Sequence, residues 1–150
     1  AGSVLAAFDL VPSLLGIAGV AAPEKAHFDG EDMADVLLGR SDRSRKAPLF
    51  WRRPPDRKSV SPAQPQRLPD LAMREDDWKL LCEYDGSGAL LYDLASDRAE
   101  QRNLAAQRPE VVARMKAELL AWHASMPPDR GPELGAEPMN AKGKGKKKAK

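Results

Sequence analysis

Apolar residues near the start of the chain recur at the spacing of a helix rather than a strand. Those that fall on one helical face are Phe8, Val11, Leu14, Leu15 and Ala18. Asp9 is placed to accept a hydrogen bond from the first turn, and Gly19 can adopt the left-handed conformation that ends a helix. We therefore predict a helix over residues 10–18, preceded by either an extended lead-in or an earlier helical turn over residues 3–8.

A second short helix is predicted over residues 33–38. Residues 28–30 indicate a turn because they end in Asp-Gly, Asp32 is a candidate N-cap, and Gly39 is placed to end the helix. The polar stretch 40–46 that follows has little to bury and is expected to be an exposed loop.

Three segments in the second half of the chain have the composition and the flanking turns of strands. They span residues 71–74, 78–84 and 89–94. The acidic turn 75–77 separates the first two, and Asp-Gly-Ser-Gly at 85–88 is a hairpin signal between the second and the third. Together they predict an antiparallel meander of three strands, or of four if the apolar run 49–51 joins it.

The longest helix is predicted to start at Pro109, a residue favoured at the first helical position, with Glu110 beside it in the first turn. One face of this helix carries Val111, Val112, Met115, Leu119, Trp122 and Met126. Pro127 and Pro128 end it. This stripe and the apolar side of the meander can bury each other, so the predicted fold class is α+β, a small antiparallel sheet packed by a C-terminal helix.

Two stretches lack the apolar positions that regular structure needs. Residues 52–69 contain five prolines and are expected to form a long surface loop. From residue 129 onward Gly, Pro, Ala and Lys dominate, so we predict a disordered tail. Its six lysines hide the charge of the rest, because the chain has a net charge of +2 while residues 1–141 alone carry −4. The tail could attract nucleic acid through counterion release, but a solvated tail is the simpler interpretation.

The apolar stretch 4–20 has the composition of neither a signal peptide nor a membrane span. Asp9 and Pro12 interrupt it, and no basic residue precedes it. A signal peptide needs a positively charged front, and a span needs about 18–20 uninterrupted apolar residues. We therefore expect no membrane span in this chain.

The strongest candidate for ligand contact is Trp51-Arg52-Arg53. An indole can stack on a sugar ring, and two guanidinium groups can hold an anionic group through bidentate hydrogen bonds. The alternative is a strand end that runs into an exposed basic loop. We treat Trp51, Arg52 and Arg53 as candidate residues at the rim of a substrate cleft.

Other reactive side chains point to structural roles. Cys82 lies in a strand-like run and is expected to be a buried thiol, because free cysteines commonly pack inside proteins. His123, one position past the apolar face of the last helix, is expected to face solvent or to act as a cap partner. His27 precedes a turn, where a pocket role is the alternative to a structural one.

The acidic residues between positions 29 and 35 do not match a calcium loop, which needs oxygen donors at positions 1, 3, 5 and 12 and a glycine at position 6. Those expected to form a turn and a helix cap instead are Asp29, Glu31, Asp32 and Asp35. Asp76 and Asp77 are expected to form a hairpin turn rather than an acid–base pair, because neighbouring side chains on a tight turn diverge. No metal ligand is assigned in this chain.

Four pieces of the sequence, in this order, resemble the C-terminal region of the formylglycine-dependent sulfatases. They are residues 8–20, beginning Phe-Asp-Leu-Val-Pro-Ser-Leu-Leu; residues 28–39 with Pro-Leu-Phe-Trp at 48–51; residues 72–81, Ala-Met-Arg-Glu-Asp-Asp-Trp-Lys-Leu-Leu; and Leu-Tyr-Asp-Leu at 91–94 with Asp97, Glu100, Asn103-Leu-Ala and Pro109-Glu-Val-Val. The resemblance covers residues 4–127 and is greatest to the arylsulfatase and N-acetylgalactosamine-6-sulfatase branch. Arg98 departs from it, since the family usually has proline after the aspartate.

The resemblance implies a catalytic apparatus that this chain does not contain. Sulfatases convert a cysteine or serine in a Cys-x-Pro-x-Arg motif into formylglycine, bind a divalent cation that is usually calcium, and use lysine and histidine around the sulfate. All these motifs would precede residue 1, and Cys82 is followed by Glu-Tyr-Asp-Gly, which is not the modification motif. No catalytic residue is therefore assigned here, and calcium and formylglycine are expected only in a longer protein.

The predicted organisation follows from these pieces. Residues 1–39 would form the helical end of an alkaline-phosphatase-like α/β catalytic domain, residues 40–70 a proline-rich loop, residues 71–128 the C-terminal subdomain, and residues 129–150 the tail. The expected partners are the missing N-terminal catalytic domain and sulfated carbohydrate, and the resemblance implies export of the whole protein. The alternatives are a free-standing module that binds an anionic glycan, or a basic-tailed protein associated with nucleic acid.

Overall fold

The computed structural model describes residues 2–53 and 69–128. In chain order the elements are the 3-10 helix η1 (Ala7–Asp9), α1 (Leu10–Ala18), α2 (Ala34–Leu37), β1 (Leu49–Arg52), β2 (Leu71–Glu75), β3 (Trp78–Cys82), β4 (Leu90–Asp93) and α3 (Pro109–Ser125). The predicted disordered tail and residues 54–68 of the predicted proline-rich loop lie outside the described residues.

The four strands form one antiparallel sheet in the order β1-β2-β3-β4. The register sets Phe50 opposite Met73, Met73 opposite Leu80, and Leu80 opposite Leu91. Residues 49–51 therefore do contribute a fourth strand. The turn between β2 and β3 places Asp76 at a φ of 49°, which the short polar side chain of an aspartate tolerates.

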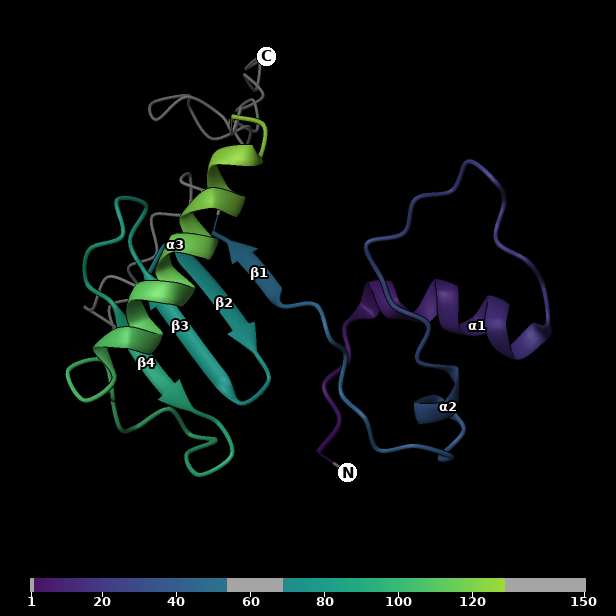
Figure 1. Cartoon of the computed structure of the whole chain (residues 1–150), viewed down its shortest axis with the longest axis horizontal. Helices are drawn as coiled ribbons and strands as arrows, with labels where there is room; N and C mark the ends of the chain where they lie inside the picture. Colours follow the sequence, from purple (N-terminus) through teal and green to yellow (C-terminus); the bar gives the residue numbers. More distant parts are fainter. Residues whose placement is uncertain (1, 54–68, 129–150) are drawn as a thin grey trace, which may run out of the picture.

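An apolar core lies between one face of this sheet and α3, which crosses the sheet in Figure 1. Its fully buried side chains are Leu71, Met73, Leu80, Cys82, Leu91, Met115 and Leu119. At the edge of the core the rings of Phe50 and Trp122 stack with their centroids 5.1 Å apart. The predicted α+β layer is thus confirmed, with Met115 and Leu119 as the centre of the predicted helical stripe.

Cys82 and His123, which lie at this core, test predictions made from the sequence. Cys82 is buried and free, and burial raises the pKa of its thiol, as suits a structural residue. His123 is not a solvent-facing residue, since it is half-buried and its ring stacks on Tyr84 with centroids 5.1 Å apart. The reason is that β3 ends at Cys82, two residues earlier than predicted, and Tyr84 then lies against α3.

The first helices form where the sequence predicts them, with one difference in capping. Gly19 ends α1 at a φ of 65°, and Gly39 follows α2 at a φ of 70°. Asp9 immediately precedes α1, but its carboxylate makes no capping hydrogen bond to that helix. Oδ2 of Asp9 instead accepts a hydrogen bond from the backbone of Ala6, 2.7 Å away, and Oδ1 accepts one from Glu31, 2.9 Å away.

The predicted second helix is shorter than expected. It covers Ala34–Leu37, so Met33 and not Asp32 is the residue that immediately precedes the helix. Oδ1 of Asp32 nevertheless accepts a hydrogen bond of 2.9 Å from the backbone N–H of Ala34. Asp32 therefore still orders the start of α2, although the helix begins one residue later than predicted.

The described chain divides into two parts (Figure 1). We call residues 2–48 the N-terminal lobe and residues 49–53 with 69–128 the sheet unit; α1 and α2 contact each other, while α3 contacts β1, β2 and β3. Of the twelve large apolar side chains that are exposed in the described residues, ten belong to the N-terminal lobe. Within the described ranges no helix has the length and apolar character needed to cross a bilayer.

Candidate functional site

The predicted rim residues lie on and just after β1, and the strand separates them. Successive side chains on a strand point to opposite faces, and Phe50 faces α3, so Trp51 lies on the other face of the sheet. Its side chain is 48% exposed. Arg52 returns to the helix side, where Nη1 donates a hydrogen bond of 3.2 Å to the carbonyl of Pro127. Trp51 and Arg52 therefore cannot close on one ligand as a single clamp.

Arg53 lies in a more constrained setting than its neighbours. Its backbone N–H donates to the carbonyl of Asp70 at 2.8 Å, and its Nη2 meets the carboxylate of the buried Asp70 at 2.7 Å. The hydroxyl of Tyr84 also donates to the Arg53 carbonyl. These contacts extend the pairing of β1 with the chain before β2. Trp51 is left as the member of the candidate cluster with the most open surface.

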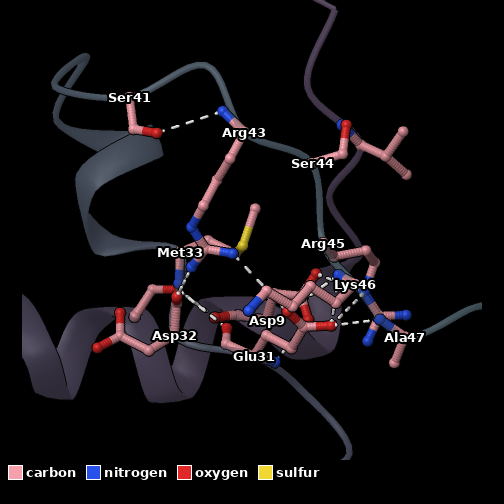
Figure 2. Close-up of polar contacts among 12 residues, drawn as sticks. Asp9, Glu31, Asp32, Met33, Ser41, Arg43, Ser44, Arg45, Lys46 and Ala47 are labelled. Carbon is pink, nitrogen blue, oxygen red and sulfur yellow. Dashed lines mark hydrogen bonds and ion pairs between the residues drawn. The ribbon is translucent and has the colours of Figure 1, made fainter. Parts of the chain in front are cut away.

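A polar cluster at the centre of the N-terminal lobe was not foreseen from the sequence. It consists of Asp9, Ser13, Glu31 and Arg45, and we call it the Asp9–Arg45 cluster. Figure 2 labels Asp9, Glu31 and Arg45. Asp9 is 0% exposed and Arg45 is 5% exposed. Nε of Arg45 lies 3.4 Å from Oδ2 of Asp9 and 4.0 Å from Oε1 of Glu31. A buried charge needs such partners, because leaving it alone is far more costly than the pair itself.

Arg45 joins three segments of the lobe. Its Nη1 donates to the carbonyl of Pro48 at 3.3 Å, and its Nη2 donates to that of Asp29 at 3.4 Å. The guanidinium carbon lies 4.8 Å from the centroid of the Phe8 ring, within the range of a cation–π contact. Arg45 thus connects the start of α1, the loop before α2 and the residue that leads into β1.

Glu31 and Ser13 complete this connection through backbone groups. Oε1 of Glu31 accepts hydrogen bonds from the backbone of Lys46 at 2.9 Å and of Ala47 at 2.7 Å. The hydroxyl of Ser13 accepts one from Met33 at 2.8 Å. Burial acts to raise the pKa of Glu31, but the Ala47 and Lys46 hydrogen bonds and the charge of Arg45 together lower it. Glu31 is therefore held in its charged form.

The chain passes very close to itself beside this cluster. A Cβ atom added to Gly30 would lie 2.1 Å from the carbonyl oxygen of Phe8 and 2.9 Å from Cα of Asp9. These are backbone atoms that cannot swing aside. Only glycine fits here, so the Asp-Gly turn places Glu31 against Asp9.

The carboxylates of the N-terminal lobe are used for these structural contacts. Asp35 forms an ion pair with Arg40 at 3.9 Å on the surface, and His27 is exposed on the loop between α1 and α2. Within the described ranges no group of three or more His, Cys, Asp or Glu side chains is placed to hold a metal ion. The calcium site that the resemblance implies stays an expectation for a longer protein.

The two sets of residues differ in how they could have been found. Trp51, Arg52 and Arg53 stand together in the sequence, and the strand then directs them apart. Asp9 and Arg45 lie 36 positions apart in segments without periodicity. The one signal for their pairing was an aspartate at the start of a helix whose other residues are all uncharged.

Comparisons with known proteins relate this chain to the sulfatases. A sulfatase from Formosa agariphila is 32% identical to the chain over 127 residues, which is 76% of this chain and 22% of that protein. No protein-family model matches the chain.

Solved structures agree on the fold. The crystal structure of Ps i-CgsB gives a TM-score of 0.59 at 21% identity, over 80% of this chain and 24% of that one. A 2-O GAG sulfatase gives 0.51 at 24% identity, over 77% and 24%. A structure described for glycosaminoglycan metabolism in Bacteroides thetaiotaomicron gives 0.54 at 24% identity, over 79% and 24%. The chain thus spans about a quarter of each of these proteins.

Proposed function

Since this chain corresponds to the C-terminal region of a sulfatase, we propose that it supports the fold of a longer enzyme that hydrolyses sulfate esters. The observation that carries the proposal is the similarity to the Formosa agariphila sulfatase at 32% identity across 76% of the chain. The rest of that enzyme would supply the nucleophile and the metal site. This chain contributes the sheet unit and the N-terminal lobe as a support for the catalytic domain.

We propose sulfated carbohydrate as the substrate class. The structural neighbours support this choice, since one belongs to glycosaminoglycan metabolism and another is a 2-O GAG sulfatase, while Ps i-CgsB was also solved in complex with k-i-k-neocarrahexaose. These substrates and this ligand are those of the neighbouring proteins. The resemblance to exported family members also supports an enzyme that acts outside the cytoplasm, which fractionation of cells that produce the longer protein would test.

Within this enzyme, Trp51 is the residue of this chain that we assign to the substrate rim. Its indole is exposed on the face of the sheet that α3 leaves open, where it can stack on a sugar ring. Arg52 and Arg53 are the accompanying cations, although their present partners are the Pro127 carbonyl and Asp70. Arg52 is the freer of the two, because its contact is with a neutral carbonyl.

The test uses the longer enzyme, assayed with a sulfated oligosaccharide and with a small aryl sulfate. Trp51→Ala should raise KM for the oligosaccharide by roughly 10-fold, the effect of losing about 1–2 kcal/mol of stacking, and should leave KM for the aryl sulfate unchanged. Met126→Ala, at a comparably exposed apolar residue past the end of α3, is the control. An unchanged oligosaccharide KM would remove Trp51 from the rim. Absence of any sulfate release by the unaltered enzyme would refute the proposed function itself.

The exposure of Trp51 also favours a second candidate, a binding module that holds an anionic glycan without hydrolysis. The 150-residue chain alone would then retain a sulfated oligosaccharide, and Trp51→Ala would abolish the retention. Calorimetry at moderate salt separates the two candidates, because a support region should show no such binding by itself.

A further inference from the structure

The face of the sheet that α3 leaves open carries an apolar row of side chains beside a charged one. The apolar row consists of residues paired in register across the four strands, Trp51, Ala72, Leu81 and Leu90. The neighbouring row has two cations at its centre and consists of Leu49, Arg74, Lys79 and Tyr92. Met73 and Leu80, which lie between the rows, point to the core under α3. Trp51 and Arg74 are therefore diagonal neighbours on the open face, with Cα atoms about 7–8 Å apart.

The two cations of the charged row are not equally neutralised. Arg74 and Lys79 stand directly opposite each other on β2 and β3, which is unfavourable for like charges. Nζ of Lys79 lies 2.5 Å from Oε1 of Glu100 and so has its own counter-ion. Arg74 makes no ion pair within residues 2–53 and 69–128, and its Nε donates to the neutral carbonyl of Asp76 at 3.1 Å. The charge of Arg74 is thus left available on this face.

A polar cavity of about 580 Å³ lies at the end of this face beside the turn between β2 and β3. Arg74 lines it from β2, Asp77 from the turn, and Arg98 and Glu100 from the loop after β4, together with residues 2–3. This volume is in the range of small-molecule sites. Arg98 is exposed and has no ion-pair partner in the part of the chain that the structure describes. Two guanidinium groups therefore share one cavity, and neither is neutralised by a carboxylate of those residues.

The loop that carries Arg98 is held in place through its backbone. The N–H of Leu94 donates a hydrogen bond of 2.7 Å to the carbonyl of Asp77. Oδ2 of Asp97 accepts a hydrogen bond of 2.8 Å from the N–H of Arg102. The guanidinium of Arg98, in contrast, forms no hydrogen bond with any residue of the described ranges. A fixed backbone with an unengaged cationic group lowers the cost of ordering the site around a ligand.

We propose that Arg74 and Arg98 form a second subsite for the sulfated carbohydrate, and that it binds a sulfate or carboxylate group on a sugar that neighbours the one stacked on Trp51. A planar guanidinium donates two parallel hydrogen bonds to such an oxyanion. The carboxylate of Asp77 can accept hydrogen bonds from the hydroxyls of the same sugar. The inference rests on the proposed function, because it takes sulfated carbohydrate as the substrate class.

The position of Arg98 makes this subsite a property of the particular chain. Arg98 is the residue at which the sequence departs from the family pattern, which usually has proline after the aspartate. The subsite would therefore select among anionic glycans for this protein, in addition to any contact that the reacting sulfate makes elsewhere. It acts on the affinity for the substrate and not on the chemical step, so its effect belongs in KM and not in kcat.

The experiment uses the longer enzyme and three oligosaccharides of equal length. One carries only the sulfate that is hydrolysed, and the others add a sulfate or a carboxylate on the neighbouring sugar. Arg98→Ala should raise KM roughly 10-fold for at least one of the two doubly charged substrates, as expected for a lost charge-assisted contact. It should leave kcat, and KM for the singly charged substrate, unchanged. Arg74→Gln, which keeps a donor for the Asp76 carbonyl, should act in the same direction.

The matched control is Arg108→Ala, which removes one exposed arginine of the sheet unit that does not line the cavity. It should leave KM for all three substrates unchanged. An equal rise in KM for Arg98→Ala and Arg108→Ala would reflect net charge alone and would overturn the subsite. So would a KM that does not depend on Arg98 for either doubly charged substrate.

Calorimetry on the longer protein separates this proposal from the proposed function. Binding of a doubly charged oligosaccharide that weakens roughly 10-fold in Arg98→Ala, without any sulfate release by the unaltered protein, would support the subsite and refute the proposed function. Sulfate release with binding that is the same in Arg98→Ala and in the unaltered protein would do the opposite.

Discussion

The N-terminal lobe and the sheet unit are stabilised in opposite ways. The sheet unit has an apolar core of seven buried side chains between its strands and α3, with Asp70 buried beside it. The lobe buries Asp9, Ser13 and Arg45 with only Val4 and Met33 as apolar companions, and exposes ten large apolar residues. A core of the first kind can be stable alone, because apolar burial is the main driving force of folding. A polar centre with an apolar exterior gains little from apolar burial unless another surface covers that exterior.

The comparison shows that the two parts of one chain carry different roles. The sheet unit encloses its own apolar core, whereas the lobe leaves its apolar surface uncovered, as the proposed longer enzyme would require. Three perturbations test this contrast.

Removal of Asp9 should have the largest effect. Asp9→Ala leaves the guanidinium of Arg45 buried without its carboxylate, a loss of about 3–5 kcal/mol, which is enough to open the N-terminal lobe. Hydrogen exchange should show fast amides in residues 29–34 and unchanged amides in β2 and β3. The matched control is Arg114→Ala, which removes an exposed ion pair with Glu75 in the sheet unit and should cost about 0.5 kcal/mol. Similar costs for the two substitutions would contradict the contrast.

Truncation of a leucine should depend on the part in which it lies. Leu80→Ala removes a fully buried side chain and should destabilise the sheet unit by about 2–5 kcal/mol. Leu14→Ala makes the same change at an exposed position of α1 and should shift the stability of the 150-residue chain by about 0.5 kcal/mol or less. Thermal or urea unfolding followed by circular dichroism checks both values. A large effect of Leu14→Ala in this chain would mean that α1 already has its apolar partner.

Acidification should loosen the lobe before the sheet unit. The pKa of Glu31 is held below its ordinary value of 4.5, so its charged form stabilises the lobe above that pH. This contribution is lost as the pH falls through the folded pKa. Exchange rates of the amides of Lys46 and Ala47 should therefore rise below about pH 4.5, after correction for intrinsic exchange. Glu31→Gln is the control, and it should abolish the pH dependence. In the sheet unit Asp97 also has a lowered pKa, because backbone N–H groups of Arg102 and Gln101 donate to it, but that loop lies outside the core.

The sequence was most informative where local pattern and packing agree. The strands, the turn at Asp76 and the helix from Pro109 follow from alternation, turn residues and a helical stripe, because each is set by near neighbours in the chain. Asp9 shows the first limit of this reasoning. Its position before α1 predicts a helix cap, but the guanidinium of Arg45, 36 residues further along the chain, holds its carboxylate. Trp51 shows the second limit. Adjacency in the sequence suggested one binding cluster, whereas the pleat of β1 sends neighbouring side chains to opposite faces.

Arg45 contacts both the start of α1 and the residue before β1. One guanidinium holds the carboxylate just before α1 and the carbonyl just before β1. A displacement of the start of α1 relative to the start of β1 would therefore have to stretch or break the contacts of this one buried side chain. Substitution of Arg45 should for that reason loosen both ends of the connection at once, the turn before α1 and the backbone that leads into β1.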